Sequence, residues 1–296
     1  MTQFLSLLLN GLSLGAIYSL IALGFVVIFK SSEVVSFMHG SLLLLGAYLI
    51  AVLQSPFGFW GAVVAGIALT AVTGLLVDRV LFARLRGAAV ITLAILTIGL
   101  DIMLSTELTR RIGSDILNIH HPWGGSVVRL GGVGITANRA IAMAVAAVLI
   151  GLFFIAFKYS NWGVAMRASA EDGEAAALMG IRLGRVSATA WMVGGALAAV
   201  AGLFLVGSPT PGITPGVGSV ALRAFPAAIL GGLDSTGGAL VGGLVIGVAE
   251  SFADGYQDQM LFLGRGFGAV VPYVVMLAVL LVRPSGLFGT RELTRV

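Results

Sequence analysis

The sequence predicts an all-α, polytopic membrane protein with about nine transmembrane helices, and three observations support this fold class. The first is composition: 58% of the 296 residues are hydrophobic and 10% are charged, whereas soluble domains carry about 25% charged residues. The second is a mean hydropathy of +1.05, with apolar runs of about 20 residues, the length that crosses a bilayer. The third is that these runs are continuous, whereas barrel strands alternate apolar and polar residues over about ten positions.

Nine apolar segments are long enough, or nearly so, to span the hydrocarbon core. They cover residues 5–29, 37–53, 58–77, 88–108, 140–157, 186–206, 219–233, 237–253 and 268–282. Eight to ten spans are compatible with this pattern, because segment boundaries inferred from one sequence vary by several residues. The 42 glycines suit such a bundle, since small residues let transmembrane helices approach closely. We expect residues 1–296 to form one transmembrane domain.

The basic residues predict an N-terminus outside and a C-terminus in the cytoplasm, because Lys and Arg are retained on the cytoplasmic side. Nine spans place three basic segments on that side. Their basic residues are Arg79, Arg84 and Arg86, then Lys158, Arg167, Arg182 and Arg185, and finally Arg283, Arg291 and Arg295. The link 110–139 conflicts with this arrangement, because its four arginines fall outside. Since the link also contains glycines and Asp115, we interpret it as a re-entrant or surface loop.

Two links, 30–41 and 207–236, predict broken helices, because polar and helix-breaking residues interrupt short apolar runs there. We expect their side chains to line a path through the bundle, together with an aspartate in the fourth apolar segment. The candidates are Ser36, His39, Ser41, Asp101, Phe225 and Pro226. Each has a structural alternative, since polar groups inside a membrane also join helices by hydrogen bonds.

The charged groups within the spans differ in what they predict. A carboxylate near the centre of a span is costly, so Asp101 faces either a cavity or a charged partner. Arg223 is one candidate partner, although it could equally extend to the outer interface. Glu250 lies near the end of a span, where we expect it to be solvated.

The cytoplasmic link at 161–181 predicts a short amphipathic helix. Ser169 is the candidate N-cap, acidic residues fill the first turns, and Gly180 is placed to end the helix. We expect an apolar face formed by Ala177, Leu178 and Ile181. An interfacial helix at the lipid headgroups and a docking helix for a partner protein both fit. The acidic start favours a protein partner, because membrane-surface helices usually carry basic polar faces.

Several motifs, taken in order and spacing over most of the chain, resemble the branched-chain amino acid ABC transporter permease family of the LivH type. They are Asn10-Gly11-Leu12 to Gly15-Ala16-Ile17-Tyr18-Ser19-Leu20, then Val35-Ser36-Phe37-Met38-His39-Gly40-Ser41 with Gly46-Ala47-Tyr48, then Arg167-Ala168 with Ala175-Ala176 to Met179-Gly180-Ile181, and Phe225-Pro226-Ala227-Ala228-Ile229-Leu230-Gly231-Gly232. Each motif is a short string, but together they are specific.

The resemblance implies a membrane-spanning permease subunit of an ABC importer in the bacterial cytoplasmic (inner) membrane. It would move branched-chain amino acids or related small polar solutes, using ATP hydrolysed by two cytoplasmic ATPase subunits. A solute-binding protein outside the membrane and a second, related permease would complete the complex, as a heterodimer or a homodimer. Asp101 and Glu107 depart from the general family pattern, so the substrate stays open between Leu, Ile or Val and urea, amides or aromatic acids.

The resemblance also implies a coupling segment at about 160–185 that enters a groove of an ATPase. Its residues are Arg167, Ala168, Glu171, Asp172, Glu174, Ala175, Ala176, Gly180 and Ile181. The chain has no Gly-x-x-x-x-Gly-Lys-Ser/Thr loop, so ATP and magnesium would bind to the partner subunits. We expect movement of the coupling segment to drive alternating access in the bundle.

Other classes of protein fit the sequence less well. We expect no cofactor or metal on this chain, because it has no cysteine and the pair His120-His121 lacks acidic residues at ligand spacing. No hydrolase or metalloprotease motif is present, so we do not expect an enzyme. The alternative is a secondary transporter or channel that works without ATPases, which would not need the cytoplasmic helix.

Overall fold

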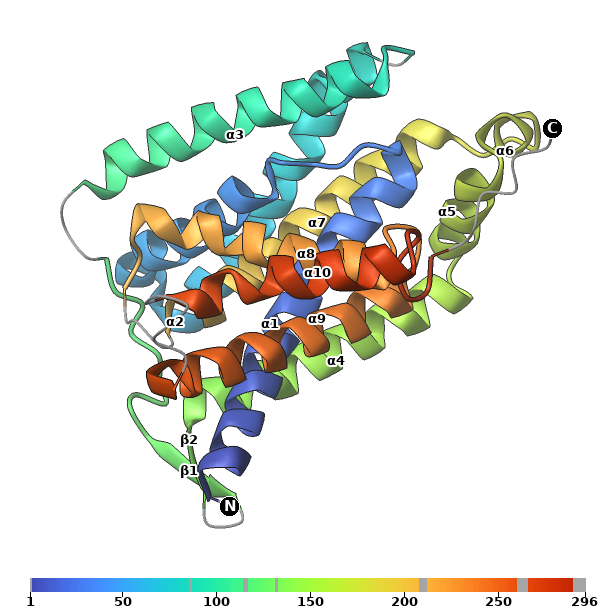
Figure 1. Cartoon of the computed structure of the whole chain (residues 1–296). Coiled ribbons are helices and arrows are strands. Elements are labelled where there is room, and N and C mark those ends of the chain that lie inside the picture. Colours follow the sequence, from blue (N-terminus) through green and yellow to red (C-terminus); the bar gives the residue numbers. More distant parts are fainter. Residues whose placement is uncertain are drawn as a thin grey trace.

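The computed structural model describes residues 2–85, 87–113, 117–130, 133–207, 212–259 and 266–289. Arg86, Asp115, Arg291 and Arg295, which enter the sequence-based predictions, lie outside these ranges. The helices within them are α1 (Thr2–Ser32), α2 (His39–Val80), α3 (Val90–Ile112), α4 (Ala137–Tyr159), α5 (Asn161–Glu171), α6 (Gly173–Leu178), α7 (Leu183–Val206), α8 (Val220–Gly231), α9 (Thr236–Gly255) and α10 (Val271–Val282), arranged as Figure 1 shows.

A mostly helical, polytopic membrane protein is confirmed. In the described part of the chain, six helices are long and apolar enough to cross a membrane. One of them, α2, contains a break at Gly58, whose φ of 66° and ψ of 176° are not helical. This break divides α2 into two arms that correspond to the predicted segments 37–53 and 58–77. The apolar helices α8 and α10 have 12 residues each, which is about 18 Å and too short to cross 30 Å of hydrocarbon.

One link contains a short β-hairpin that the sequence did not predict. Strands β1 (Val127–Leu130) and β2 (Val133–Thr136) form an antiparallel hairpin between α3 and α4. Three of the eight paired positions are valines and one is an isoleucine, and such β-branched residues favour strands. The hairpin lies inside the link 110–139, which the sequence predicted to be a re-entrant or surface loop.

Helices α1 and α7 form the centre of the bundle. The most apolar 18-residue windows of these helices are 83% and 78% buried, against 6% for α3 and 22% for α4. Glycines allow α9 to pack closely on α1: a Cβ atom added at Gly247 would lie 2.2 Å from the Gly15 nitrogen. Such backbone proximity is the usual function of small residues in membrane helices.

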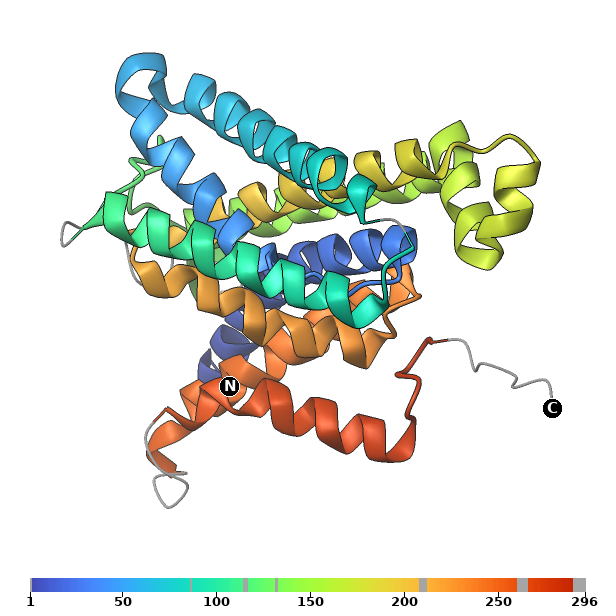
Figure 2. The same cartoon turned by 90° about the horizontal axis from the view of Figure 1, so that it is seen from above.

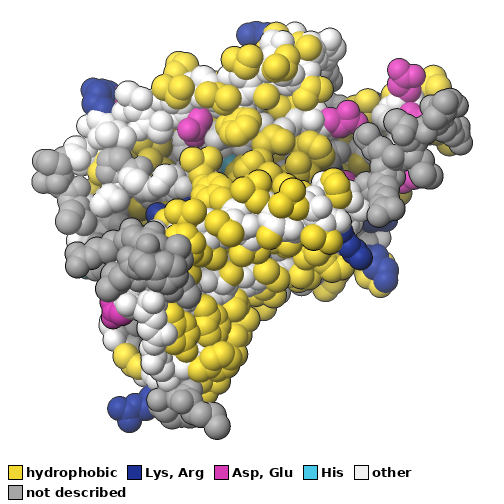
Figure 3. Space-filling view, viewed as in Figure 1, with side chains coloured by type: hydrophobic (Ala, Val, Ile, Leu, Met, Phe, Trp, Pro, Cys, Tyr) yellow, Lys and Arg dark blue, Asp and Glu magenta, His cyan; other side chains and the backbone are white. Residues whose placement is uncertain are grey.

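The periphery of the bundle is apolar. Side chains on α3 such as Ile91, Ile95 and Met103 are 61–71% exposed. Hydrophobic side chains form a broad area across the middle of the face seen in Figure 3, with Lys and Arg side chains mainly toward its edges. A continuous apolar surface of this kind faces lipid, because a soluble monomer rarely exposes one.

The two ends of the bundle carry different elements. One end holds the N-terminus and the β-hairpin, and the other holds α5 and α6, which project from the bundle in Figures 1 and 2. At the second end the Lys30 ammonium donates to the Asp234 carbonyl at 2.7 Å. There too, the backbone N–H groups of Leu287 and Phe288 bond the carbonyls at the end of α8 at 2.8 and 3.1 Å. The C-terminal segment therefore satisfies carbonyl groups that a helix end leaves unpaired.

Candidate functional site

The chain re-enters the bundle between α1 and α2. Helix α1 ends at Ser32, and α2 begins at His39 after a non-helical link. His39 is fully buried, and its ring lies 4.5 Å from the ring of Phe25 on α1. A Cβ atom at Gly24 would lie 2.5 Å from the His39 ring. The first helical turn of α2 thus starts inside the bundle, beside the second half of α1.

Helix α3 supplies the polar groups that end this link. The Asp101 carboxylate accepts the backbone N–H of Ser41 at 3.1 Å, and the Thr97 hydroxyl accepts the N–H of Phe37 at the same distance. The N-cap position, Met38, offers no side-chain bond. Asp101 therefore caps α2 from a neighbouring helix, where the macrodipole favours a negative charge. Arg223, one candidate partner of Asp101, pairs with Glu250 instead.

Helix α8 begins at the same place. It follows the short 3₁₀ helix η2 (Pro215–Ser219), and a Cβ atom at Gly40 would lie 2.7 Å from the Gly218 carbonyl oxygen. The Phe225 ring lies 5.4 Å from Phe25 and 6.2 Å from Phe37. The starts of α2 and α8 therefore meet across a small aromatic cluster.

The six side chains predicted to line a path consequently lie near the start of α2, in the first two turns of α8 and on the adjacent part of α3. We call this group the helix-break junction; it consists of Ser36, His39, Ser41, Asp101, Phe225 and Pro226. Within the described residues, the Ser36 hydroxyl and both ring nitrogens of His39 are buried without a hydrogen-bond partner. Buried polar atoms in proteins are normally paired, so these three are available to a water molecule or a solute. Their role in transport stays a prediction.

The link at 161–181 forms two helices rather than the one predicted. The Ser160 hydroxyl caps α5 by accepting the Gly163 N–H at 3.1 Å, and the Asp172 carboxylate caps α6 by accepting the Ala175 N–H at 2.9 Å. The predicted N-cap, Ser169, is wrong, since its hydroxyl bonds the Met166 carbonyl inside α5. Gly180 follows α6 with a φ of 87°, a conformation that ends helices.

The tip of this helix pair is exposed. Leu178 and Met179 are 89% and 84% exposed, and Glu171, Asp172 and Glu174 are exposed beside them. Of the predicted apolar face, Ala177 and Leu178 are exposed, whereas Ile181 is half-buried. Exposed apolar side chains beside carboxylates are typical of a protein-docking surface rather than of a helix against anionic headgroups.

The base of the pair is fixed to the bundle. Arg167 donates to the backbone carbonyl of Phe157 at the end of α4, and its guanidinium lies 5.2 Å from the Phe157 ring centroid. A Cβ atom at Gly163 would lie 2.1 Å from the same carbonyl, so α5 approaches α4 very closely. Ala176 is buried, and α6 packs against α7. A force on the tip would therefore reach both α4 and α7.

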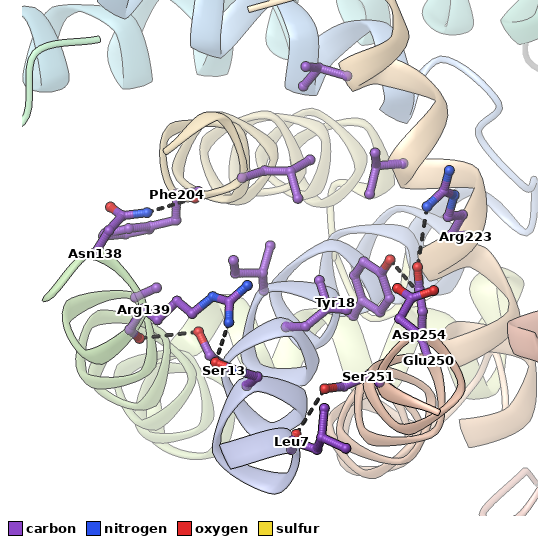
Figure 4. Close-up of a pocket in the computed structure, with 18 residues that line it drawn as sticks. Leu7, Ser13, Tyr18, Asn138, Arg139, Phe204, Arg223, Glu250, Ser251 and Asp254 are labelled. Carbon is purple, nitrogen blue, oxygen red and sulfur yellow. Dashed lines mark hydrogen bonds and ion pairs between the residues drawn. The ribbon is translucent and has the colours of Figure 1, made fainter. Parts of the chain in front are cut away.

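A separate polar cluster joins α1, α8 and α9, and the sequence did not predict it. Glu250 is 3% exposed, so the expectation that it is solvated is wrong. The Tyr18 hydroxyl donates to its carboxylate at 2.7 Å, and the Arg223 guanidinium lies 3.3 Å away (Figure 4). The sequence feature that could have indicated this cluster is the Glu250 carboxylate, which lies inside an apolar segment. It could not identify the partners, which lie 232 and 27 positions away in the chain.

Of the two adjacent histidines, His121 contributes packing, whereas the backbone of His120 bonds the Gln54 side chain. The His121 ring stacks on Trp123 with centroids 5.1 Å apart and lies 5.8 Å from the Phe59 ring. Burial, together with the neighbouring His120, lowers the pKa of His121. Among the residues that the structure describes, no group of three or more His, Cys, Asp or Glu side chains could hold a metal ion.

The apolar periphery, the broken helices at the centre and the exposed helix pair define a multi-pass membrane protein of the transporter class. The chain belongs to the family described as branched-chain amino acid transport system / permease component, whose model matches residues 7–281.

Relatives cover nearly the whole chain. The high-affinity branched-chain amino acid transport system permease protein LivH of Escherichia coli K12 is 33% identical over 99% of this chain and 98% of its own length. The corresponding protein BraD of Pseudomonas aeruginosa is also 33% identical, over the same shares. A probable LivH permease of Methanocaldococcus jannaschii is 30% identical over 91% of this chain and 88% of its own. No solved structure matches.

Proposed function

We propose that this chain is the membrane-spanning permease subunit of an ABC importer for branched-chain amino acids or related small polar solutes. Family membership supports transport of this kind. The observation that supports coupling to an ATPase is the exposed α5–α6 tip, with Leu178 and Met179 more than 80% exposed beside acidic residues. A secondary transporter has no need for such a surface.

The proposed complex contains two cytoplasmic ATPase subunits, a second permease and a solute-binding protein outside the membrane. ATP and magnesium bind to the ATPases, and α5–α6 lies in the cytoplasm of a bacterial inner membrane. Two arrangements support this orientation. Lys30, Arg167 and Arg182 lie at the α5–α6 end, as expected for a cytoplasmic face. The N-terminus lies at the opposite end (Figure 1).

The proposed mechanism begins at α6. When the ATPases close, they move the tip, and α6 moves with the start of α7, against which it packs. Helix α7 packs along α2 through small residues: a Cβ atom at Gly195 would lie 2.7 Å from the Thr70 carbonyl oxygen. Such contacts transmit shifts because packed interiors deform little. The start of α2, at the helix-break junction, then changes its position relative to α8.

The helix-break junction suits a passage rather than a tight site. It offers the Ser36 hydroxyl and the His39 ring as neutral polar groups, and its one carboxylate, Asp101, already holds α2. Neutral hydrogen bonds are weaker than charge-assisted ones, so a solute would not be retained there. Selection by a separate binding protein would make a tight site in the membrane unnecessary.

A pull-down tests the proposed function. The detergent-solubilised chain is mixed with candidate ATPase subunits, and the wild type is compared with Glu174→Arg and Leu178→Ser, both at the exposed tip. Asp258→Arg, an exposed carboxylate beyond α9, is the matched control for charge reversal. We expect the wild type and the control to retain the ATPases and both tip variants to lose at least about tenfold, as for hot-spot residues. A wild-type chain that recruits no ATPase and yet transports solute alone would instead indicate a secondary transporter.

A further inference from the structure

A cavity of about 530 Å³ opens at the N-terminal end of the bundle, between α1, α4, α8 and α9. We call it the outer cavity. It is separate from the helix-break junction: its lining on α1 runs from Leu7 to Tyr18, whereas the junction lies beside Gly24 and Phe25. Its volume lies within the usual range for small-molecule sites, about 300–1,000 Å³.

The outer cavity carries charges of both signs. Arg139 and Arg223 supply two positive groups, and Glu250 and Asp254 supply two negative ones. Figure 4 shows Arg139 on the α4 side and the two carboxylates on the α9 side, with Tyr18 between them. The remaining wall is largely apolar, with Leu14, Ile17, Phe204 and Val220 among its residues.

Two of these charges occupy helix positions that do not favour them. Arg139 lies in the first turn of α4, where the macrodipole opposes a cation, and Asp254 lies in the last turn of α9, where it opposes an anion. The first turn of α4 contains no acidic residue, and the last turn of α9 contains no basic residue. The Arg139 guanidinium donates instead to the amide oxygen of Asn10 on α1. Violations of local rules of this kind are expected at functional sites.

The same helix ends strengthen the separation of charge. The N-terminus of α4 adds a partial positive charge to the Arg139 side, and the C-terminus of α9 adds a partial negative charge to the Asp254 side. The Glu250 charge is largely engaged by Tyr18 and Arg223. The Asp254 carboxylate is close enough to interact electrostatically with Arg223 but accepts no hydrogen bond from a described residue, so it is the carboxylate with acceptor capacity left for a ligand.

We propose that the outer cavity binds the zwitterionic backbone of an amino acid, and this rests on the proposed transport function. The substrate carboxylate lies toward Arg139 and the start of α4, and its ammonium lies toward Asp254. The apolar side chain packs on the wall formed by Ile17, Phe204 and Val220. The cavity thus receives the solute before it reaches the helix-break junction.

The chain has no cysteine, so a single introduced thiol can report occupancy. Val220→Cys places it on the cavity wall, and Ser126→Cys on the exposed link near the hairpin is the control. The full chain in lipid nanodiscs is alkylated by a water-soluble maleimide with and without L-leucine. The two companion ligands are isopentylamine, which lacks the carboxylate, and 4-methylpentanoate, which lacks the amine.

We expect L-leucine to slow labelling at Val220→Cys at least threefold, at a lower concentration than either companion, and to leave Ser126→Cys unchanged. Adding Arg139→Gln should remove the advantage of leucine over isopentylamine. Adding Asp254→Asn should instead remove its advantage over 4-methylpentanoate. Arg129→Gln, in the exposed β1, is the control and should change neither. A structural role would not produce this crossed pattern.

Two results would overturn the proposal. One is equal protection by all three ligands, and the other is no protection by leucine in a chain that still elutes as a single species. The ATPase pull-down separates this test from that of the proposed function. ATPase recruitment without protection would reject the cavity site alone, whereas protection without recruitment would reject the ATPase-coupled function alone.

Discussion

The outer cavity and the helix-break junction place polar groups in the same bundle in different ways. The outer cavity holds four charged side chains, with Arg139 and the carboxylates at separate sides. The junction holds neutral polar atoms of Ser36 and His39, and its carboxylate is bonded to backbone. Tyr18 and Gly24, which mark the two levels on α1, are about 9 Å apart along that helix. The comparison supports the proposal that the charged outer cavity receives the solute and that the neutral helix-break junction lets it pass on. We call these two regions the charged level and the neutral level.

The largest effect should come from the charged level. Glu250→Ala removes the acceptor of the Tyr18 hydroxyl and leaves Arg223 unpaired. Breaking a buried pair costs about 3–5 kcal/mol, and the 38% exposure of Arg223 reduces this, so we expect a loss of about 2–3 kcal/mol. Thermal unfolding of the purified chain measures it. Glu250→Gln keeps an acceptor for Tyr18 and should lose about half as much; an unchanged midpoint in both variants would show that the cluster contributes no stability.

A smaller effect is expected at the junction. Asp101→Ala leaves the start of α2 without its external cap, and loss of a cap costs about 0.5–2 kcal/mol. Asp101→Asn retains an acceptor oxygen and should recover most of this stability. Leucine protection at Val220→Cys should remain in both variants, because the outer cavity is a separate site. Loss of protection in Asp101→Ala would show that the two levels are not independent.

A substitution at His39 should affect transport much more than stability. His39→Leu removes two buried nitrogens without partners, which offsets the poorer packing of a changed shape. We therefore expect a stability change below about 1 kcal/mol, together with uptake reduced at least fivefold. Uptake into vesicles by His39→Leu is compared with uptake by the control variant Ser105→Ala, which removes an exposed hydrogen bond from the Ser105 hydroxyl to the Ile102 carbonyl on α3. Normal uptake by a folded His39→Leu chain would make His39 a packing residue.

The smallest effect concerns pH and the link between α3 and the hairpin. Because the pKa of His121 is lowered in the folded chain, the unfolded chain binds a proton at a pH where the folded one does not. Stability should therefore fall as pH drops below about 6.5, the ordinary histidine pKa. In His121→Phe this dependence should shrink, with a difference of a few degrees in the midpoint at pH 5.5. An identical pH profile in the two chains would contradict the burial of His121.

The sequence predicted features that depend on neighbouring residues. The apolar segments predicted the helices, and the polar link 30–41 predicted the break before His39. Gly180 predicted the end of α6. Each of these features follows from local composition or from backbone freedom. The N-cap was wrong by three positions, since both Ser169 and Asp172 suit a cap. The charges were predicted least well. Asp101 bonds a backbone group 60 positions away, and Glu250 pairs with Tyr18 across 232 positions, so only the packed bundle identifies their partners.

The most direct test is uptake of radiolabelled leucine by proteoliposomes that contain this chain, its companion permease, the candidate ATPases and the solute-binding protein. We predict uptake that requires ATP and that falls at least tenfold in Glu174→Arg, whose exposed carboxylate lies on α6. The Asp258→Arg control should transport normally. Uptake by the chain alone, without ATP and unaffected by Glu174→Arg, would contradict the account.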